Sequence, residues 1–243
     1  MDPPVALATA HAPRPVPVGR VFVWYEEAMR LFKRAPMIWC VLGLITVASE
    51  LVLNFVPGIG VALAKVIVPV IECGMLLGAA AVDRGEPLQV RVAVAVFAAR
   101  PAALAAIVVS ALLIFGVEAW TAYSVAGVNL LENGDGETSL TAAALASVFA
   151  AGALVSLPVM FVPFAALFEG ASFTRAFATS ARGFALNVLP LLIFGALALV
   201  LVLIGLLSFG FGLIAIFPLL SAASYAAWKD VYVVATPPGN RAS

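Results

Sequence analysis

Three ionisable residues, Glu50, Lys65 and Glu72, lie inside long apolar runs, where their spacing could support chemistry. Charged groups inside a bilayer are costly, so each one needs a partner or a role. Pro57-Gly58 is the predicted turn between the first two runs, with Glu50 eight positions before Gly58 and Lys65 eight positions after Pro57. In an antiparallel helical hairpin this spacing places both side chains about 11 Å from the turn. We therefore predict an ion pair, which either only fastens the hairpin or forms a polar site for a proton, an ion or an anionic head group.

Glu72 follows Lys65 by seven residues, so both side chains project from the same face of the second helix. They are about 10 Å apart along the axis, which is too far for an easy direct bond. Pro69 lies between them, and its missing N–H leaves the carbonyl of Lys65 without its usual partner. A kinked helix with these groups would suit a site at the membrane midplane. The alternative interpretation is that Glu72 is a protonated, hydrogen-bonded side chain with no further role. The candidate intramembrane polar site is thus Glu50, Lys65 and Glu72.

Other chemistries lack the residues that they need. His11 is the only histidine and lies in the N-terminal tail, which excludes a histidine metal cluster or a histidine-based triad. The sequence has no Gly-rich phosphate loop ending in Gly-Lys-Ser/Thr. Cys40 and Cys73 fall within apolar runs and are interpreted as small buried hydrophobes. Glu118, close to Trp120, is interpreted as a solvated carboxylate at an aromatic belt. We predict no catalytic residue, no metal and no cofactor, and we expect that the protein is not an enzyme.

The composition identifies the environment that these residues occupy. Of the 243 residues, 64% are hydrophobic and 11% are charged, and the mean hydropathy is +1.13. A single water-exposed globule could not bury so much apolar surface, but a bilayer can solvate it. A helix needs about 20 apolar residues to cross the hydrocarbon core. Six runs meet that length, and they are too continuously apolar for the alternating strands of a barrel. The runs cover residues 36–56, 58–82, 101–123, 141–168, 188–207 and 213–232.

The basic residues predict the orientation of these six spans. Apart from Lys65, all Lys and Arg residues precede the first run, lie in the last turn of the sixth or after it, or lie between the second and third or the fourth and fifth. The connection between the third and fourth runs instead carries Glu132, Asp135 and Glu137. Cytoplasmic loops are enriched in Lys and Arg, so both termini are expected in the cytoplasm. The formal net charge is zero, and this charge asymmetry is not typical of a nucleic-acid-binding protein.

The fold predicted is an all-α polytopic bundle of six transmembrane helices, arranged as three hairpins that each follow a short in-plane amphipathic helix. Before the first span, Val21, Tyr25, Ala28 and Phe32 share one face, which is expected to lie on the inner membrane surface. Weaker elements precede the third and fifth spans, although any three hairpins in a chain rich in Ala, Val and Leu would look alike. The predicted divisions are a disordered Pro-rich tail (1–17), an interfacial amphipathic helix (18–35), the six-span domain (36–232) and a disordered tail (233–243).

One pattern resembles a known family. It consists of Trp24-x7-Phe32-x-x-x-Pro36-x-x-Trp39 and a closing Tyr225-x-x-Trp228-x-Asp230. The pattern resembles an uncharacterised family of six-helix bacterial inner-membrane proteins, and it is similar to the membrane domain found beside some glycerophosphodiester phosphodiesterases. The resemblance implies a bacterial inner (cytoplasmic) membrane location. The soluble catalytic domain of the phosphodiesterases has no counterpart here, so no catalytic residue is carried over.

Two functions are compatible with these features. The first is a non-enzymatic inner-membrane protein with a structural, assembly or lipid-interacting role, whose partners are the bilayer and anionic lipid head groups at the cytoplasmic face. The second is a small transporter or channel that uses Glu50, Lys65 and Glu72. A water-accessible cavity between the spans would favour the second function, and a dry interior the first. The sequence leaves the substrate and the oligomeric state open.

Overall fold

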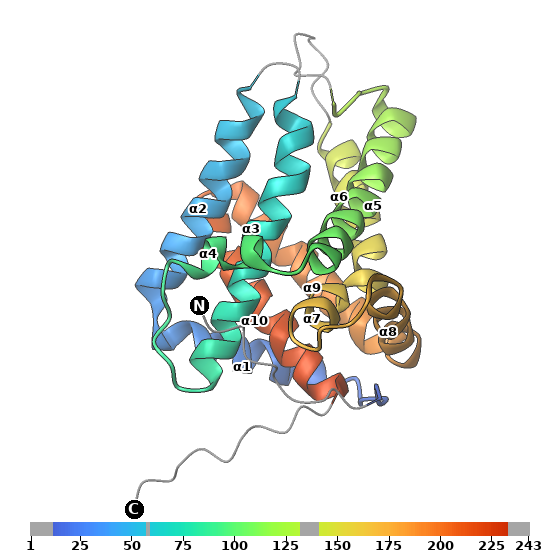
Figure 1. Cartoon of the computed structure of the whole chain (residues 1–243). Helices are drawn as coiled ribbons and strands as arrows, with labels where there is room; N and C mark the ends of the chain where they lie inside the picture. The colour runs from blue at the N-terminus through green and yellow to red at the C-terminus, as the bar shows by residue number, and fades with distance from the viewer. Residues whose placement is uncertain (1–11, 57–58, 132–140, 233–243) are drawn as a thin grey trace, which may run out of the picture.

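The computed structural model describes residues 12–56, 59–131 and 141–232, and all regular secondary structure in these ranges is helical (Figure 1). Four long helices stand side by side in the order α2, α3, α5, α6. Their bounds are Pro36–Asn54 (α2), Gly60–Asp83 (α3), Pro101–Ala126 (α5) and Ala142–Val159 (α6). The remaining elements are α1 (Arg20–Arg34), α4 (Val92–Ala95), η1 (Val96–Ala98), α7 (Val162–Leu167), α8 (Phe173–Leu186), α9 (Val188–Leu207) and α10 (Leu213–Tyr232).

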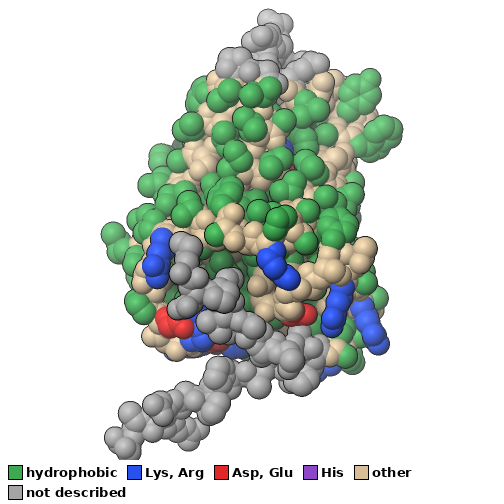
Figure 2. Space-filling view, in the orientation of Figure 1, with side chains coloured by type: hydrophobic (Ala, Val, Ile, Leu, Met, Phe, Trp, Pro, Cys, Tyr) green, Lys and Arg blue, Asp and Glu red, His purple; other side chains and the backbone are tan. Residues whose placement is uncertain are grey.

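The two ends of this bundle differ in the side chains that they expose. We call the end that carries α1, α8 and the connection 84–91 the basal end. The opposite end, where α2 and α5 finish and α3 and α6 begin, is the apical end. Lys and Arg side chains gather in the basal half, whereas hydrophobic side chains cover most of the apical half (Figure 2).

Among the described residues, five helical segments are long and apolar enough to cross a membrane, so the chain has the architecture of a multi-pass membrane protein. They are Pro36–Asn54, Gly60–Asp83, Pro101–Ala126, Ala142–Leu167 and Val188–Leu207. The predicted sixth span, α10, is not among them. Its last turns carry Lys229 and Asp230, and most of its side chains from Ala222 onward are buried against other helices.

The predicted fourth span is broken near its basal end. α6 finishes at Val159 and α7 begins at Val162, with Pro158 and Pro163 on either side of the break. Proline supplies no N–H, so helical hydrogen bonds are missing here. Ser180 of α8 compensates, because its hydroxyl donates to the Pro158 carbonyl at 2.7 Å and accepts from the Phe161 N–H at 3.0 Å. The break therefore fixes α8 against α6 and α7.

The amphipathic helix α1 packs on protein rather than resting on the bilayer by its main apolar face. Val21, Trp24, Ala28 and Leu31 are buried, and the helix lies along α10 with further contacts to α9. The sequence pattern predicted the helix and its apolar face correctly, but it predicted that this face would lie on the membrane surface rather than on α10. The reason is that α10 offers an apolar surface of matching length, which no local pattern can reveal.

Residues 12–17 also differ from the tail expected over 1–17. The Arg14 N–H donates to the Val231 carbonyl at 2.9 Å, and the Val16 N–H donates to the side-chain oxygen of Asn187 at 2.8 Å. Asn187 returns a bond from its amide nitrogen to the Arg14 carbonyl at 3.0 Å. These bonds hold residues 12–17 as an extended strap across α9 and α10. The parts of both predicted tails at 1–11 and 233–243 lie outside the described residues.

Aromatic side chains join α7 to the basal half of α10. The rings of Phe164 and Trp228 stack with centroids 5.2 Å apart, and Phe168 stacks on the same indole at 5.3 Å. Phe161 meets Tyr232 edge-to-face at 5.4 Å. Such pairs stabilise a core beyond the area that they bury. Tyr225 and Trp228 of the closing sequence pattern thus belong to the core.

Candidate functional site

The predicted ion pair between α2 and α3 is present. The Lys65 ammonium donates to a Glu50 carboxylate oxygen at 2.7 Å. The Lys65 ammonium also lies 5.5 Å from the centroid of the Phe115 ring of α5, a favourable position for a cation. Both charged side chains remain about one-third exposed, at 29% for Lys65 and 33% for Glu50. The equal depth inferred from the turn therefore reflects a real contact near the apical end.

Glu72 is not part of this pair. It lies halfway along α3, where it lines a pocket of about 350 Å³ between α3, α5, α6, α9 and α10. Among the described residues, no hydrogen bond or ion pair reaches its carboxylate. Four serines add hydroxyl groups to the same pocket: Ser110, Ser156, Ser221 and Ser224. The structure therefore divides the predicted site into an apical ion pair and a central pocket.

Glu118 is more enclosed than the sequence suggested. A Cβ on Gly152 of α6 would overlap the Glu118 carboxylate, so α5 and α6 approach closely because residue 152 is glycine. Glu118 is therefore partly buried at the contact between α5 and α6, and it is less solvated than the sequence suggested.

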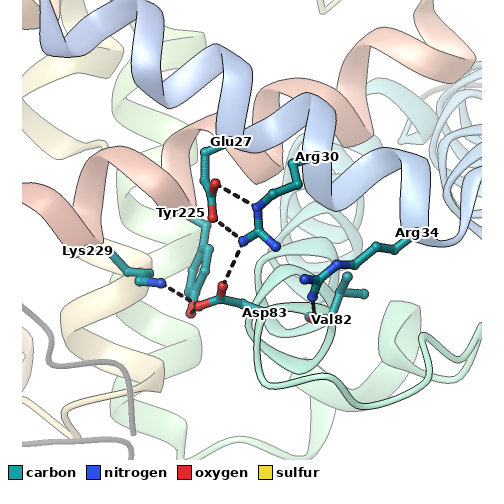
Figure 3. Close-up of polar contacts among 7 residues, drawn as sticks. All are labelled: Glu27, Arg30, Arg34, Val82, Asp83, Tyr225 and Lys229. Atoms are coloured by element: carbon teal, nitrogen blue, oxygen red, sulfur yellow. Dashed lines mark hydrogen bonds and ion pairs between the residues drawn. The ribbon is translucent and has the colours of Figure 1, made fainter. Parts of the chain in front are cut away.

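A second polar cluster, which the sequence analysis missed, surrounds Asp83 at the basal end of α3 (Figure 3). The Asp83 side chain is only 8% exposed. Its carboxylate accepts hydrogen bonds from the Lys229 ammonium, from the Tyr225 hydroxyl at 3.0 Å and from Arg30 at 3.3 Å. Arg30 also pairs with Glu27 on its own helix, and this hydrogen bond lowers the pKa of Glu27. The cluster ties α1 and α10 to the end of α3.

A third cluster surrounds Asp230 on α10. Its carboxylate is 7% exposed and accepts from Arg20 at 2.6 Å, from Arg14 at 2.9 Å and from the Trp24 indole at 2.9 Å. Every donor comes from α1 or from the strap before it. Trp24 and Asp230 stand at opposite ends of the sequence pattern noted above, and the structure shows that they form a structural hydrogen bond.

A groove of about 760 Å³ opens at the basal end between the start of α2 and the connection after α3. Arg34 and Glu86 line it beside apolar side chains that include Met37, Pro87 and Leu88. Arg34 also donates to the Val82 carbonyl at 2.8 Å, which holds its guanidinium beside the groove. The groove therefore offers a basic group next to an apolar wall.

Asp83 was missed because it lies just beyond the second apolar run, and Asp230 was missed because it lies in the polar last turn of the sixth. The closing pattern with Asp230 was the one available signal for its importance. Within the described part of the chain, no group of three His, Cys, Asp or Glu side chains could hold a metal ion.

Comparisons of the chain with protein-family models, with curated proteins and with solved structures find no match.

Proposed function

We propose that the chain is a non-enzymatic, multi-pass protein of the bacterial inner membrane that interacts with anionic lipid at its basal face. One observation carries this proposal. Five exposed basic side chains of the basal half take part in none of the ion pairs or side-chain hydrogen bonds between described residues: Lys33, Arg91, Arg100, Arg175 and Arg182. Basic residues beside an anionic leaflet contribute about 1 kcal/mol each, so such a set favours lipid head groups as partners.

The basal face is assigned to the cytoplasm because that side of bacterial membrane proteins is enriched in Lys and Arg. The resemblance to six-helix bacterial inner-membrane proteins supports the same placement. Both termini then lie in the cytoplasm, whether α9 and α10 complete the predicted fifth and sixth crossings or turn back within the bilayer.

The test is lipid-dependent stability of the purified full chain. Phosphatidylglycerol should raise the Tm in detergent more than phosphatidylcholine does, and added salt should reduce the difference because it screens exposed charges. The double variant Arg175→Gln, Arg182→Gln should lose part of the effect. Arg84→Gln is the matched control, because Arg84 already pairs with Glu86 at 2.6 Å. Equal Tm shifts with the two lipids would overturn the proposal.

A second candidate, a small transporter or channel, is favoured by the pocket beside Glu72. Glu72 lies about 18 Å of helix from the start of α3 and about 16 Å from its end, which is the middle of a membrane-length helix. A pocket that holds a carboxylate and serine hydroxyls at this depth suits alternating access. Proteoliposomes that contain the protein should then dissipate an imposed pH gradient, and Glu72→Gln should stop this. A tight membrane with the unmodified protein would count against proton or ion transport.

A further inference from the structure

The pocket beside Glu72 presents a carboxylate and two serine oxygens as hydrogen-bond acceptors, and no Lys or Arg side chain lines it. The Ser110 hydroxyl donates to the Ile107 carbonyl and the Ser156 hydroxyl to the Ala153 carbonyl, each at 2.8 Å. With their protons so engaged, both oxygens offer lone pairs to the pocket. An ionised Glu72 carboxylate can only accept hydrogen bonds. The basic side chain nearest along the helix, Lys65, is bonded to Glu50 instead.

The walls of this pocket are apolar and partly aromatic. Phe194 and Phe217 line it, together with Met75 and Leu76. Aromatic rings attract organic cations through their negative faces, and a carboxylate in a low-dielectric pocket adds charge attraction. The volume of about 350 Å³ lies within the usual range of about 300–1,000 Å³ for small-molecule pockets.

We propose that this pocket binds a small protonated organic amine, with the ammonium group at Glu72 and the serine oxygens and the hydrocarbon part against the phenylalanines. An ammonium carries only donors, which match the acceptors of the pocket, whereas an anion would meet Glu72 unfavourably. The assignment stands without the proposed lipid interaction, since none of the exposed basic side chains lines this pocket.

The experiment compares phenethylamine with the neutral isostere 2-phenylethanol, by calorimetry and thermal shift on the full chain in detergent. The amine should bind saturably and raise the Tm, and the alcohol should not. Glu72→Gln should weaken amine binding at least tenfold, whereas Glu86→Gln, on the exposed connection, should leave it unchanged.

If Glu72→Gln fails to fold, Ser221→Leu supplies a second test, because it fills the pocket without changing any charge. Loss of amine binding in Ser221→Leu would support the site. Equal shifts with amine and alcohol, or amine binding unchanged in either folded variant, would overturn it.

The turn between α9 and α10 lies well below the apical end of the bundle, and this position supports a second inference. A Cβ on Gly43 of α2 would overlap the carbonyl oxygen of Ile214, the second residue of α10. Eleven residues, or about 16 Å of helix, separate Gly43 from the apical end of α2 at Asn54. In Figure 1 the upper parts of α2, α3, α5 and α6 accordingly rise above α9 and α10.

The turn itself, residues 208–212, has the character of a segment in lipid. Leu207, Phe209 and Phe211 are 83%, 95% and 74% exposed, and no charged residue occurs between 188 and 228. The hydrogen bonds of the turn are internal: the Ser208 hydroxyl donates to the Gly205 carbonyl at 2.6 Å and accepts the Gly212 N–H at 2.7 Å. Non-helical backbone at membrane depth requires such satisfaction.

We infer that α9 and α10 form a re-entrant hairpin, which enters from the basal side and turns back inside the hydrocarbon. α9 has the length and hydropathy of a span, but the contact at Gly43 stops the turn well short of the apical end. Gly43 and Glu50 share one face of α2, because seven residues make about two helical turns. The Glu50–Lys65 pair therefore stands directly above the tip of the hairpin.

Spin-label accessibility tests this depth in vesicles, after Cys40 and Cys73 are replaced by Ala. A nitroxide at Phe209 should collide with oxygen and be shielded from a water-soluble nickel complex. A nitroxide at Phe55, which is 84% exposed at the apical end of α2, is the matched control and should be reached by nickel. Equal nickel accessibility at both positions would show that α9 and α10 cross completely.

Discussion

At the scale of single residues, Asp83 and Asp230 carry the most concentrated polar contacts. Each carboxylate is less than one-tenth exposed and accepts from three side chains that belong to other elements. Removing one member of a buried ion pair leaves an uncompensated charge, which is costlier than losing the pair as a whole. These two residues should therefore be sensitive to neutral substitution.

Asp83→Asn should lower the free energy of unfolding by about 3 kcal/mol, because Lys229 and Arg30 lose their shared carboxylate. Chemical denaturation in mixed micelles measures the change. Glu86→Gln is the control, since Glu86 is exposed and its substitution should stay within about 0.5 kcal/mol. Similar small losses in both variants would mean that the Asp83 cluster contributes little.

The Glu50–Lys65 pair predicts a different pattern. Glu50→Gln and Lys65→Met should each destabilise the protein more than the double variant does, because each leaves one charge unpaired. A coupling energy of about 1 kcal/mol is expected for such a contact. The thermodynamic cycle of the four proteins measures it, and additive losses would show that the 2.7 Å contact adds no net stability.

At the scale of elements, the strap and α1 form one unit held on α10. Asn187→Ala removes one acceptor for the Val16 N–H and one donor to the Arg14 carbonyl. Trypsin should then cleave the folded protein after Arg20, just beyond the strap, several-fold faster. Thr121→Ala is the control, because Thr121 bonds only within α5. Unchanged cleavage would mean that other contacts suffice to hold the strap.

Acid should loosen α1 in a defined direction. The Arg30 hydrogen bond lowers the pKa of Glu27 below its ordinary value of 4.5, so the charged carboxylate favours the folded state. This contribution is complete above pH 4.5 and is lost as the pH falls through the lower folded-state pKa. Glu27 is partly exposed, so the contribution is at most about 1 kcal/mol. The difference in stability between the unmodified protein and Glu27→Gln should shrink from pH 6 to pH 3. A constant difference would contradict the assignment.

At the scale of the whole molecule, the charge distribution predicts the orientation. In a variant without Cys40 and Cys73, Leu131→Cys after α5 should react with an impermeant thiol reagent in whole cells. Val90→Cys before α4 should react only after the inner membrane is opened. Both positions are exposed, at 51% and 40%, so the comparison is matched. Labelling at Val90 in intact cells would overturn the proposed orientation.

The sequence predicted the helices and the apical ion pair but not how the helices pair laterally. The bounds of α9 and α10 agree with the predicted runs, and Glu50 meets Lys65 because the turn constrains both. The partner of α1 escaped prediction because periodicity shows which face is apolar and not what covers it. Asp83 escaped because its partners lie 53 and up to 146 positions away.

The bond between Trp24 and Asp230 has a consequence for biosynthesis. The two residues are 206 positions apart, so a ribosome that adds about 5–20 residues per second completes α10 some 10–40 seconds after α1 has emerged. During that interval the apolar face of α1 lacks α10, the helix along which it packs. The bilayer surface is the nearest apolar cover, and the amphipathic pattern of α1 suits it. The nascent chain would then hold its first helix on the membrane surface until its last helix arrives.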